Sequence, residues 1–138
     1  MRNWIFLLIV LALAIDDPQE VARHQGIWVA VSMEREEVKT PLEIVETITR
    51  SVDGDHVVWK RSGKSFAGTT IKLDPATDPK SIDVTPDGGP DRDKAVFGIY
   101  KLKGDKLTIC MADAGETRPK EFSSPRGSKR TMMSFRRK

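Results

Sequence analysis

The stretch Gln25-Gly26-Ile27-Trp28-Val29-Ala30-Val31 decides the fold of this chain. Its aromatic and β-branched side chains favour an extended backbone. Side chains alternate along a strand, so Trp28 and Ala30 share one face while Val29 and Val31 share the other. Both faces are apolar, which predicts a first strand that is covered on both sides.

Further strand-like runs follow, separated by turn residues. The segments Asp53-Gly54-Asp55 and Lys103-Gly104-Asp105 are signals of tight turns between strands. The expected strands are 25–33, 42–51, 56–60, 65–73, 81–85, 95–102, 106–112 and 130–136. About eight short strands and no long helix predict an all-β antiparallel barrel or a sandwich. A closed barrel of about eight strands holds its own side chains or one small ligand.

Two segments carry helical signals. Residues 17–24 predict one or two helical turns, with Asp17 as the cap and Pro18 at the first position, and such a helix plugs one end of a barrel. Residues 42–51 fit a helical period loosely at Leu42 and Val45, but they also alternate. Their β-branched content favours a strand, which is our prediction for this segment.

The beginning of the chain has the layout of a secretory signal peptide. A short basic segment, 1–3, precedes an apolar run, 4–13, that is shorter than the roughly 20 residues of a membrane span. An Ala-x-Ala step at 12–14 then offers a cleavage site. We expect a signal peptide over 1–14, a single domain over 15–138 and export to the periplasm or the extracellular space. The alternative is an uncleaved membrane anchor.

The order of short motifs along the chain resembles a known family. The motifs are Gln25-Gly26-Ile27-Trp28, the segment from Gly68 to Asp74-Pro75, Pro79-Lys80-Ser81-Ile82-Asp83, Gly98-Ile99-Tyr100, Gly104-Asp105, Leu107-Thr108-Ile109-Cys110, Arg118-Pro119 and Phe122. Together they resemble a small domain family best known from planctomycete bacteria and described as lipocalin-like. The resemblance covers roughly residues 21–137, is weakest over 36–52, and implies a lipocalin-like barrel. The family has no established activity.

Lipocalins place a Gly-x-Trp on their first strand and pack a basic residue of the last strand over the indole. Gly26-x-Trp28 is similar to this motif, with Arg136 and Arg137 as candidate partners. A guanidinium over an indole face contributes roughly 0.5–2 kcal/mol. This contact would join the first strand to the last, which is a structural role.

No motif indicates catalysis, a metal or a cofactor. Cys110 is the only cysteine, which excludes an internal disulfide, and in an apolar strand it is expected to be a small buried hydrophobe. His24 and His56 lack the spacing of metal ligands. The aspartates between 87 and 93 do not match a calcium-binding loop. We therefore expect a protein that is not an enzyme and has no metal and no cofactor.

The chain has a formal net charge of +3, and its basic residues gather near the end. Residues 118–138 hold eight Lys and Arg against one acid, yet a weak overall excess does not predict nucleic-acid binding. We expect a monomer, with no stable membrane span after cleavage, that binds a small hydrophobic or anionic molecule. Trp28, Phe97 and Tyr100 are the expected cavity residues and Arg118 the expected anion contact at its mouth. The alternative is a protein-interaction or envelope-associated structural module with a filled barrel.

Overall fold

The computed structural model describes residues 17–138, so the predicted signal peptide lies outside the described residues. The elements are α2 (Pro18–Arg23), β1 (Gly26–Arg35), β2 (Val38–Lys39), α3 (Leu42–Val45), β3 (Ile48–Asp53), β4 (His56–Arg61), β5 (Lys64–Asp74), β6 (Lys80–Pro86), β7 (Val96–Lys103), β8 (Lys106–Ala112) and β9 (Arg130–Arg137). None of the helices in this range is long and apolar enough to cross a membrane.

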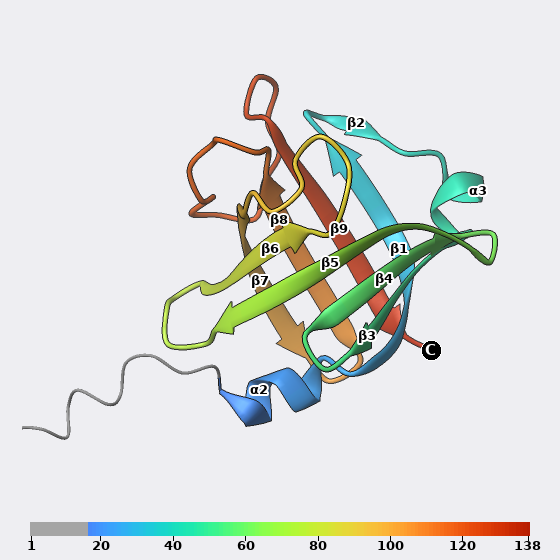
Figure 1. Ribbon diagram of the computed structural model, residues 1–138. Helices are drawn as coiled ribbons and strands as arrows, with labels where there is room; N and C mark the ends of the chain where they lie inside the picture. The colour runs from blue at the N-terminus through green and yellow to red at the C-terminus, as the bar shows by residue number, and fades with distance from the viewer. Residues whose placement is uncertain (1–16) are drawn as a thin grey trace, which may run out of the picture.

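The strands form one antiparallel sheet that closes on itself (Figure 1). The order is β2-β1-β3-β4-β5-β6-β7-β8-β9, and β1 also pairs with β9. Eight strands therefore make a closed barrel, while β2 extends β1 as a short hairpin. The predicted all-β antiparallel barrel with a short N-terminal helix is confirmed, and the sandwich is excluded because β1 pairs with β9.

The prediction of one strand over residues 42–51 is wrong. Residues Leu42–Val45 form the helical turn α3, and the strand begins only at Ile48. The backbone N–H of Val45 donates to the carbonyl of Pro41, which closes the turn. This turn carries the Val45 side chain into the core, where it is almost fully buried. Burial of that side chain outweighs the β propensity of the segment.

The prediction that β1 is covered on both sides is also wrong. Trp28 and Ala30 face the barrel interior and are buried, whereas Ile27 and Val31 are 45% and 46% exposed. The register between β1 and β9 shifts between Ala30 and Ser32, which indicates a bulge at Val31. Apolar residues on the outer face of a small barrel are common, because polar groups cannot cover the whole surface.

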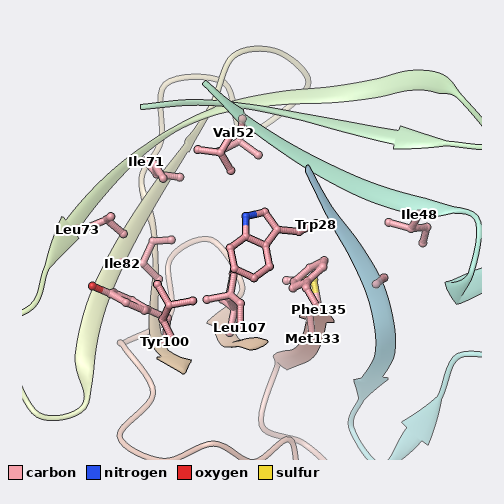
Figure 2. Packing of buried hydrophobic residues seen from close by; sticks show 14 of the residues in the cluster. Trp28, Ile48, Val52, Ile71, Leu73, Ile82, Tyr100, Leu107, Met133 and Phe135 are labelled. Carbon is pink, nitrogen blue, oxygen red and sulfur yellow. The ribbon is translucent and has the colours of Figure 1, made fainter. Parts of the chain in front are cut away.

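Trp28 anchors the half of the barrel next to α2, which we call the packed half. Figure 2 shows its indole among buried side chains that include Leu107 and Phe135. The indole N–H donates to the carbonyl of His24 at 2.9 Å, directly after α2. The guanidinium of Arg137 lies over the indole at 4.2 Å from the ring centroid. The predicted contact between the first and last strands is thus made by Arg137.

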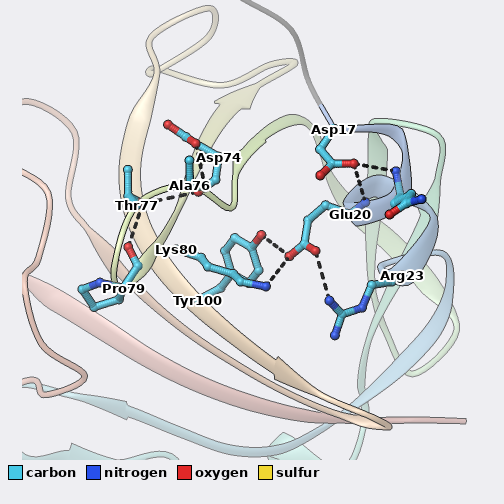
Figure 3. A network of polar contacts seen from close by, with 10 residues as sticks. Asp17, Glu20, Arg23, Asp74, Ala76, Thr77, Pro79, Lys80 and Tyr100 are labelled. Atoms are coloured by element: carbon cyan, nitrogen blue, oxygen red, sulfur yellow. Dashed lines mark hydrogen bonds and ion pairs between the residues drawn. The ribbon is translucent and has the colours of Figure 1, made fainter. Parts of the chain in front are cut away.

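Helix α2 is fastened to this end of the barrel through a buried carboxylate. Asp17 caps the helix by accepting from the backbone N–H groups of Gln19 and Glu20, as predicted. Glu20 itself is buried and accepts from the Tyr100 hydroxyl and from Lys80 (Figure 3). Because α2 occupies this end, any unfilled space in the barrel must lie in the opposite half, which we call the distal half.

Candidate ligand-binding site

The distal half of the barrel contains a cavity of about 120 Å³. Its lining consists of two polar and eight apolar side chains, namely Arg50, Thr69, Trp59, Ile71, Ile82, Val84, Val96, Ile109, Met111 and Met133. Trp59, Val84, Val96 and Met111 are only partly buried, in contrast to the fully buried side chains around Trp28. The cavity therefore reaches the surface at the end away from α2.

Arg50 extends into this cavity from β3. In the sheet it lies directly opposite Trp28 on β1 and Trp59 on β4. Directly opposed residues project to the same face of a sheet, so all three point into the barrel. Arg50 is 1% exposed, and its guanidinium carbon lies 5.9 Å from the centroid of the Trp59 ring. An arginine is thus enclosed between two indole-bearing strands.

The guanidinium of Arg50 has no counter-charge among the described residues. Its Nε and Nη1 atoms find no hydrogen-bond partner among residues 17–138, and no carboxylate in that range forms an ion pair with it. Burial lowers the pKa of Arg50 to about 10, so the side chain stays protonated at neutral pH. An unpaired charge in a protein interior is costly, and proteins usually pair it or bind an ion there.

Two more polar side chains inside the barrel lack partners. The hydroxyl of Thr69 is buried, lines the same cavity and makes no hydrogen bond within the described residues. His24, at the junction of α2 and β1, is fully buried and neither ring nitrogen has a partner in that range. Burial lowers the pKa of His24 to about 4, and the positive charge of Arg50 is the next largest cause. The electrostatic influence of Arg50 therefore extends to His24.

Gly98 leaves room for the side chain of Met111, which forms part of the cavity wall. Gly98 on β7 lies directly opposite Met111 on β8. A Cβ atom at Gly98 would lie only 2.2 Å from the sulfur of Met111 and 2.7 Å from the carbonyl oxygen of Cys110. The Met111 side chain thus lies across the bare backbone of Gly98. A larger residue at position 98 would displace Met111, whose side chain lines the cavity.

The structure does not bring the four predicted site residues together. Trp28 and Tyr100 lie in the packed half, and neither lines the cavity. Phe97 and Arg118 lie on the outside of the barrel, where Arg118 stacks on Phe97 at 5.0 Å from the ring centroid. Arg118 also donates to the carbonyls of Ile82 and Gly98, and to the Asp83 carboxylate at 2.7 Å. These contacts fasten the 113–129 segment to β6 and β7.

Arg50 was missed by sequence reasoning. The signal that could have found it is the alternation of Ile48, Arg50 and Val52, which places a lone arginine on an otherwise apolar face. A strand over 42–51 hides this signal, because Glu46 would share the face of Ile48 and Arg50 while Val52 would lie beyond the end of the strand. Once the strand begins at Ile48, its three inward positions are unambiguous.

The structure also describes the groups that could act as a nucleophile or as metal ligands. Cys110 is buried on the outer face of β8, where its thiol donates to the carbonyl of Ser123 at 3.5 Å. Burial raises the pKa of this thiol, which makes it a poor nucleophile. Within residues 17–138 no three His, Cys, Asp or Glu side chains are grouped closely enough to hold a metal ion.

A second hollow, the outer groove, lies outside the barrel. Its volume is about 610 Å³. It is formed by β1, the β1–β2 hairpin, α3, β9 and the segment 122–125, with Val31 and Leu42 among its exposed apolar side chains. The backbone N–H groups of Glu36 and Glu37 donate to Ser124, which ties the two walls together. Among the described residues that line it, none carries a buried unpaired charge comparable with that of Arg50.

Searches for similar proteins found no family model, no curated sequence and no solved structure that matches this chain. The family resemblance of the motifs therefore stays a prediction, and the site has to be interpreted from its own chemistry.

Proposed function

We propose that this protein is a non-enzymatic binding protein that holds a small hydrophobic or anionic molecule in the distal half of its barrel. One observation carries the proposal: the guanidinium of Arg50 is buried, has no partner within residues 17–138, and lies beside space that no side chain of that range fills. A group that needs a counter-charge and a cavity that can hold one are found at the same place. Among the described residues, the lining contains no His, Cys, Asp, Glu, Lys or Tyr, so the hydroxyl of Thr69 has no general base there to activate it.

The energetics of the site favour an occupied state. Leaving a buried charge without a partner destabilises a protein, often by 3–5 kcal/mol or so when a partner has been removed. A ligand that supplies a negative charge would offset this cost while filling the apolar space. Ligand cavities commonly measure about 300–1,000 Å³. The cavity here is about 120 Å³, so its ligand is small or projects from the distal end.

Native mass spectrometry of the protein from its own host tests this function. The expected result is an added mass of reproducible value that is lost in the Arg50→Gln variant. Arg136→Gln serves as the matched control, because Arg136 is exposed on β9. A bare chain from the host, together with no response of the tryptophan fluorescence to small anions or apolar molecules, would refute the function.

Export is a separate part of the proposal. It rests on the sequence of residues 1–14, which has the charged, apolar and small-residue regions of a signal peptide. Amino-terminal sequencing of protein from the host should give a chain that begins at Ile15, recovered outside the cytoplasm. A chain that retains Met1 in the cytoplasmic fraction would contradict export and would leave the barrel site unaffected.

The alternative function is a protein-interaction module, and the outer groove favours it. Val31 and Leu42 expose apolar surface there, and such patches can mark contacts with other proteins. The two functions make opposite predictions. A partner bound in the groove would be lost with Val31→Lys and retained with Arg50→Gln, whereas a ligand in the barrel would show the reverse.

A further inference from the structure

We infer that the ligand is a compact apolar monocarboxylate, held by Arg50 and Thr69 with its hydrocarbon part directed toward the distal end. This inference rests on the proposed function and specifies the chemical class of the molecule that the cavity accepts. Four features of the cavity limit that class: the charge of Arg50, the unpaired hydrogen-bond donors, the apolar lining and the end at which the cavity opens.

The charge of the site limits the ligand to one negative charge. Within the part of the chain that the structure describes, Arg50 is the only charged side chain that lines the cavity. A monoanion would neutralise it, whereas a phosphate dianion would carry a second charge into the interior, with no cation in the lining to meet it. A carboxylate also matches the planar guanidinium in shape and hydrogen-bonding geometry.

The unpaired donors indicate two-point recognition. Arg50 and Thr69 both line the cavity. The Nε and Nη1 atoms of Arg50 and the hydroxyl of Thr69 are buried behind its apolar surface, and all three lack partners within residues 17–138. A carboxylate has two oxygen atoms and about four acceptor sites. It can therefore accept from the guanidinium and from the threonine hydroxyl together. A neutral amide or alcohol would leave the charge of Arg50 uncompensated.

The walls require the rest of the ligand to be apolar and small. Apart from Arg50 and Thr69, the lining consists of Trp59 and of branched or sulfur-containing aliphatic side chains. The volume of about 120 Å³ is close to that of cavities of about 150 Å³ that take up benzene. The cavity thus accommodates one ring or a chain of about six carbons.

The direction of the ligand follows from the two ends of the barrel. Trp28 and Tyr100 fill the half next to α2, so nothing can extend that way. At the other end the lining residues Val84, Val96 and Met111 are partly exposed. The carboxylate would therefore point inward to Arg50, and a chain longer than the cavity would emerge at the distal end.

Calorimetric titration with matched probes tests the class. The probes are acetate, hexanoate, decanoate and hexanamide, the last being the neutral counterpart of hexanoate. Hexanoate should bind at least about tenfold more tightly than acetate, which lacks most of the apolar contact. It should also bind at least about tenfold more tightly than hexanamide, which lacks the charge. Decanoate should bind as well as hexanoate because its extra carbons reach solvent.

Two variants identify the residues that recognise the carboxylate. Arg50→Gln should abolish the preference for hexanoate over hexanamide. Thr69→Val, which keeps the shape of the side chain, should lower the affinity for hexanoate about fivefold. Circular dichroism of both variants confirms that the barrel is intact.

The outcomes separate this inference from the function on which it rests. If hexanamide binds as tightly as hexanoate, or if Arg50→Gln leaves the preference unchanged, the carboxylate class is overturned while binding in the cavity stands. If decanoate is excluded although hexanoate binds, the assigned direction is overturned. If none of the probes binds, the carboxylate class is overturned, whereas the proposed function is overturned only if the protein from its own host is also a bare chain.

Discussion

The guanidinium of Arg137 lies over the indole of Trp28 at the seam where the last strand meets the first. The same guanidinium donates to the carbonyls of Gln25 at 2.6 Å and Arg23 at 2.9 Å, and to the Asp105 carboxylate at 3.1 Å. One side chain therefore joins β9, β1, the end of α2 and the β7–β8 turn. We therefore expect barrel closure to depend on this side chain.

Replacing Arg137 with alanine should lower the free energy of unfolding by about 2–3 kcal/mol, because a cation–π contact and several hydrogen bonds are lost. Arg136→Ala is the matched control. Arg136 is the neighbouring residue but is exposed, so its loss should change stability by less than about 0.5 kcal/mol. Urea unfolding measures both variants. Equal effects of the two substitutions would contradict a special role for Arg137.

Replacing Arg50 with methionine should stabilise the empty protein. Methionine has a similar length and fills apolar space, and exchanging buried charges for apolar side chains often raises stability by about 1–4 kcal/mol. The same variant should lose binding of the anionic ligand. Thermal unfolding without ligand, combined with titration, measures both effects. A strongly destabilised Arg50→Met would show that Arg50 has a structural partner.

The strands and turns were predictable because their signals are local. Gly54 and Gly104 have positive φ in the turns that the sequence marked, and Asp17 caps α2 through its own side chain. The contact between Trp28 and the last strand was also predictable, since it follows from a motif on each strand. In the turns and at the helix cap, residues close in sequence determine the geometry, whereas the contact with Trp28 was predicted from the resemblance to lipocalins.

The site was not predictable in the same way. Arg118 precedes a proline in a polar segment, and nothing local shows that this segment folds back over the outside of β7 to reach Asp83. Arg50 points inward because it shares a face of β3 with Ile48 and Val52, and that face is turned inward by pairing with β1 and β4. Both positions depend on contacts between distant segments, which a single sequence does not display.

Replacing Gly98 with alanine should close part of the cavity. The added Cβ would collide with the sulfur of Met111, and the flexible thioether would have to move off the backbone of β7. The carbonyl of Cys110 is also too close, so the strand itself would shift and stability should fall by about 1–3 kcal/mol. The double variant with Met111→Ala should recover ligand binding if Met111 is what blocks the cavity. Unchanged binding by Gly98→Ala alone would contradict this geometry.

His24 should make stability depend on pH between about 4 and 6.5. Burial holds its pKa near 4 in the folded protein, below its ordinary value of 6.5. The unfolded chain therefore binds the proton first as pH falls, and stability decreases from pH 6.5 down to about 4, by roughly 3 kcal/mol in all. The pKa of Glu20 is lowered from 4.5, chiefly by its hydrogen bond to Tyr100 against the opposing effect of burial, so Glu20 acts only below that pH.

Urea unfolding at a series of pH values checks this dependence. His24→Phe should flatten the curve between pH 4.5 and 6.5, where His24 acts without Glu20. His56→Gln is the matched control, because His56 is the only other histidine and is exposed. If the pH dependence of stability persists in His24→Phe and vanishes in His56→Gln, then His56 and not His24 causes it.

The pKa of His24 should also report whether an anion occupies the barrel. After burial, the positive charge of Arg50 is the largest cause that holds this pKa near 4. Arg50→Gln removes that charge and should raise the pKa of His24, because protonation no longer meets repulsion. A bound anion beside Arg50 should raise it in the same direction. A sulfonate probe such as hexanesulfonate remains ionised at low pH and avoids titration of the ligand itself.

Proton NMR of the His24 ring measures these shifts, with the His56 ring in the same spectrum as an internal reference. Wild type with hexanesulfonate and free Arg50→Gln should both titrate above the free wild type, while addition of the probe to Arg50→Gln should change nothing further. If the pKa of His24 rises in Arg50→Gln but does not change when hexanesulfonate is added to the wild type, the anion does not bind beside Arg50. Because this readout senses charge and not affinity, it locates the ligand independently of the titrations.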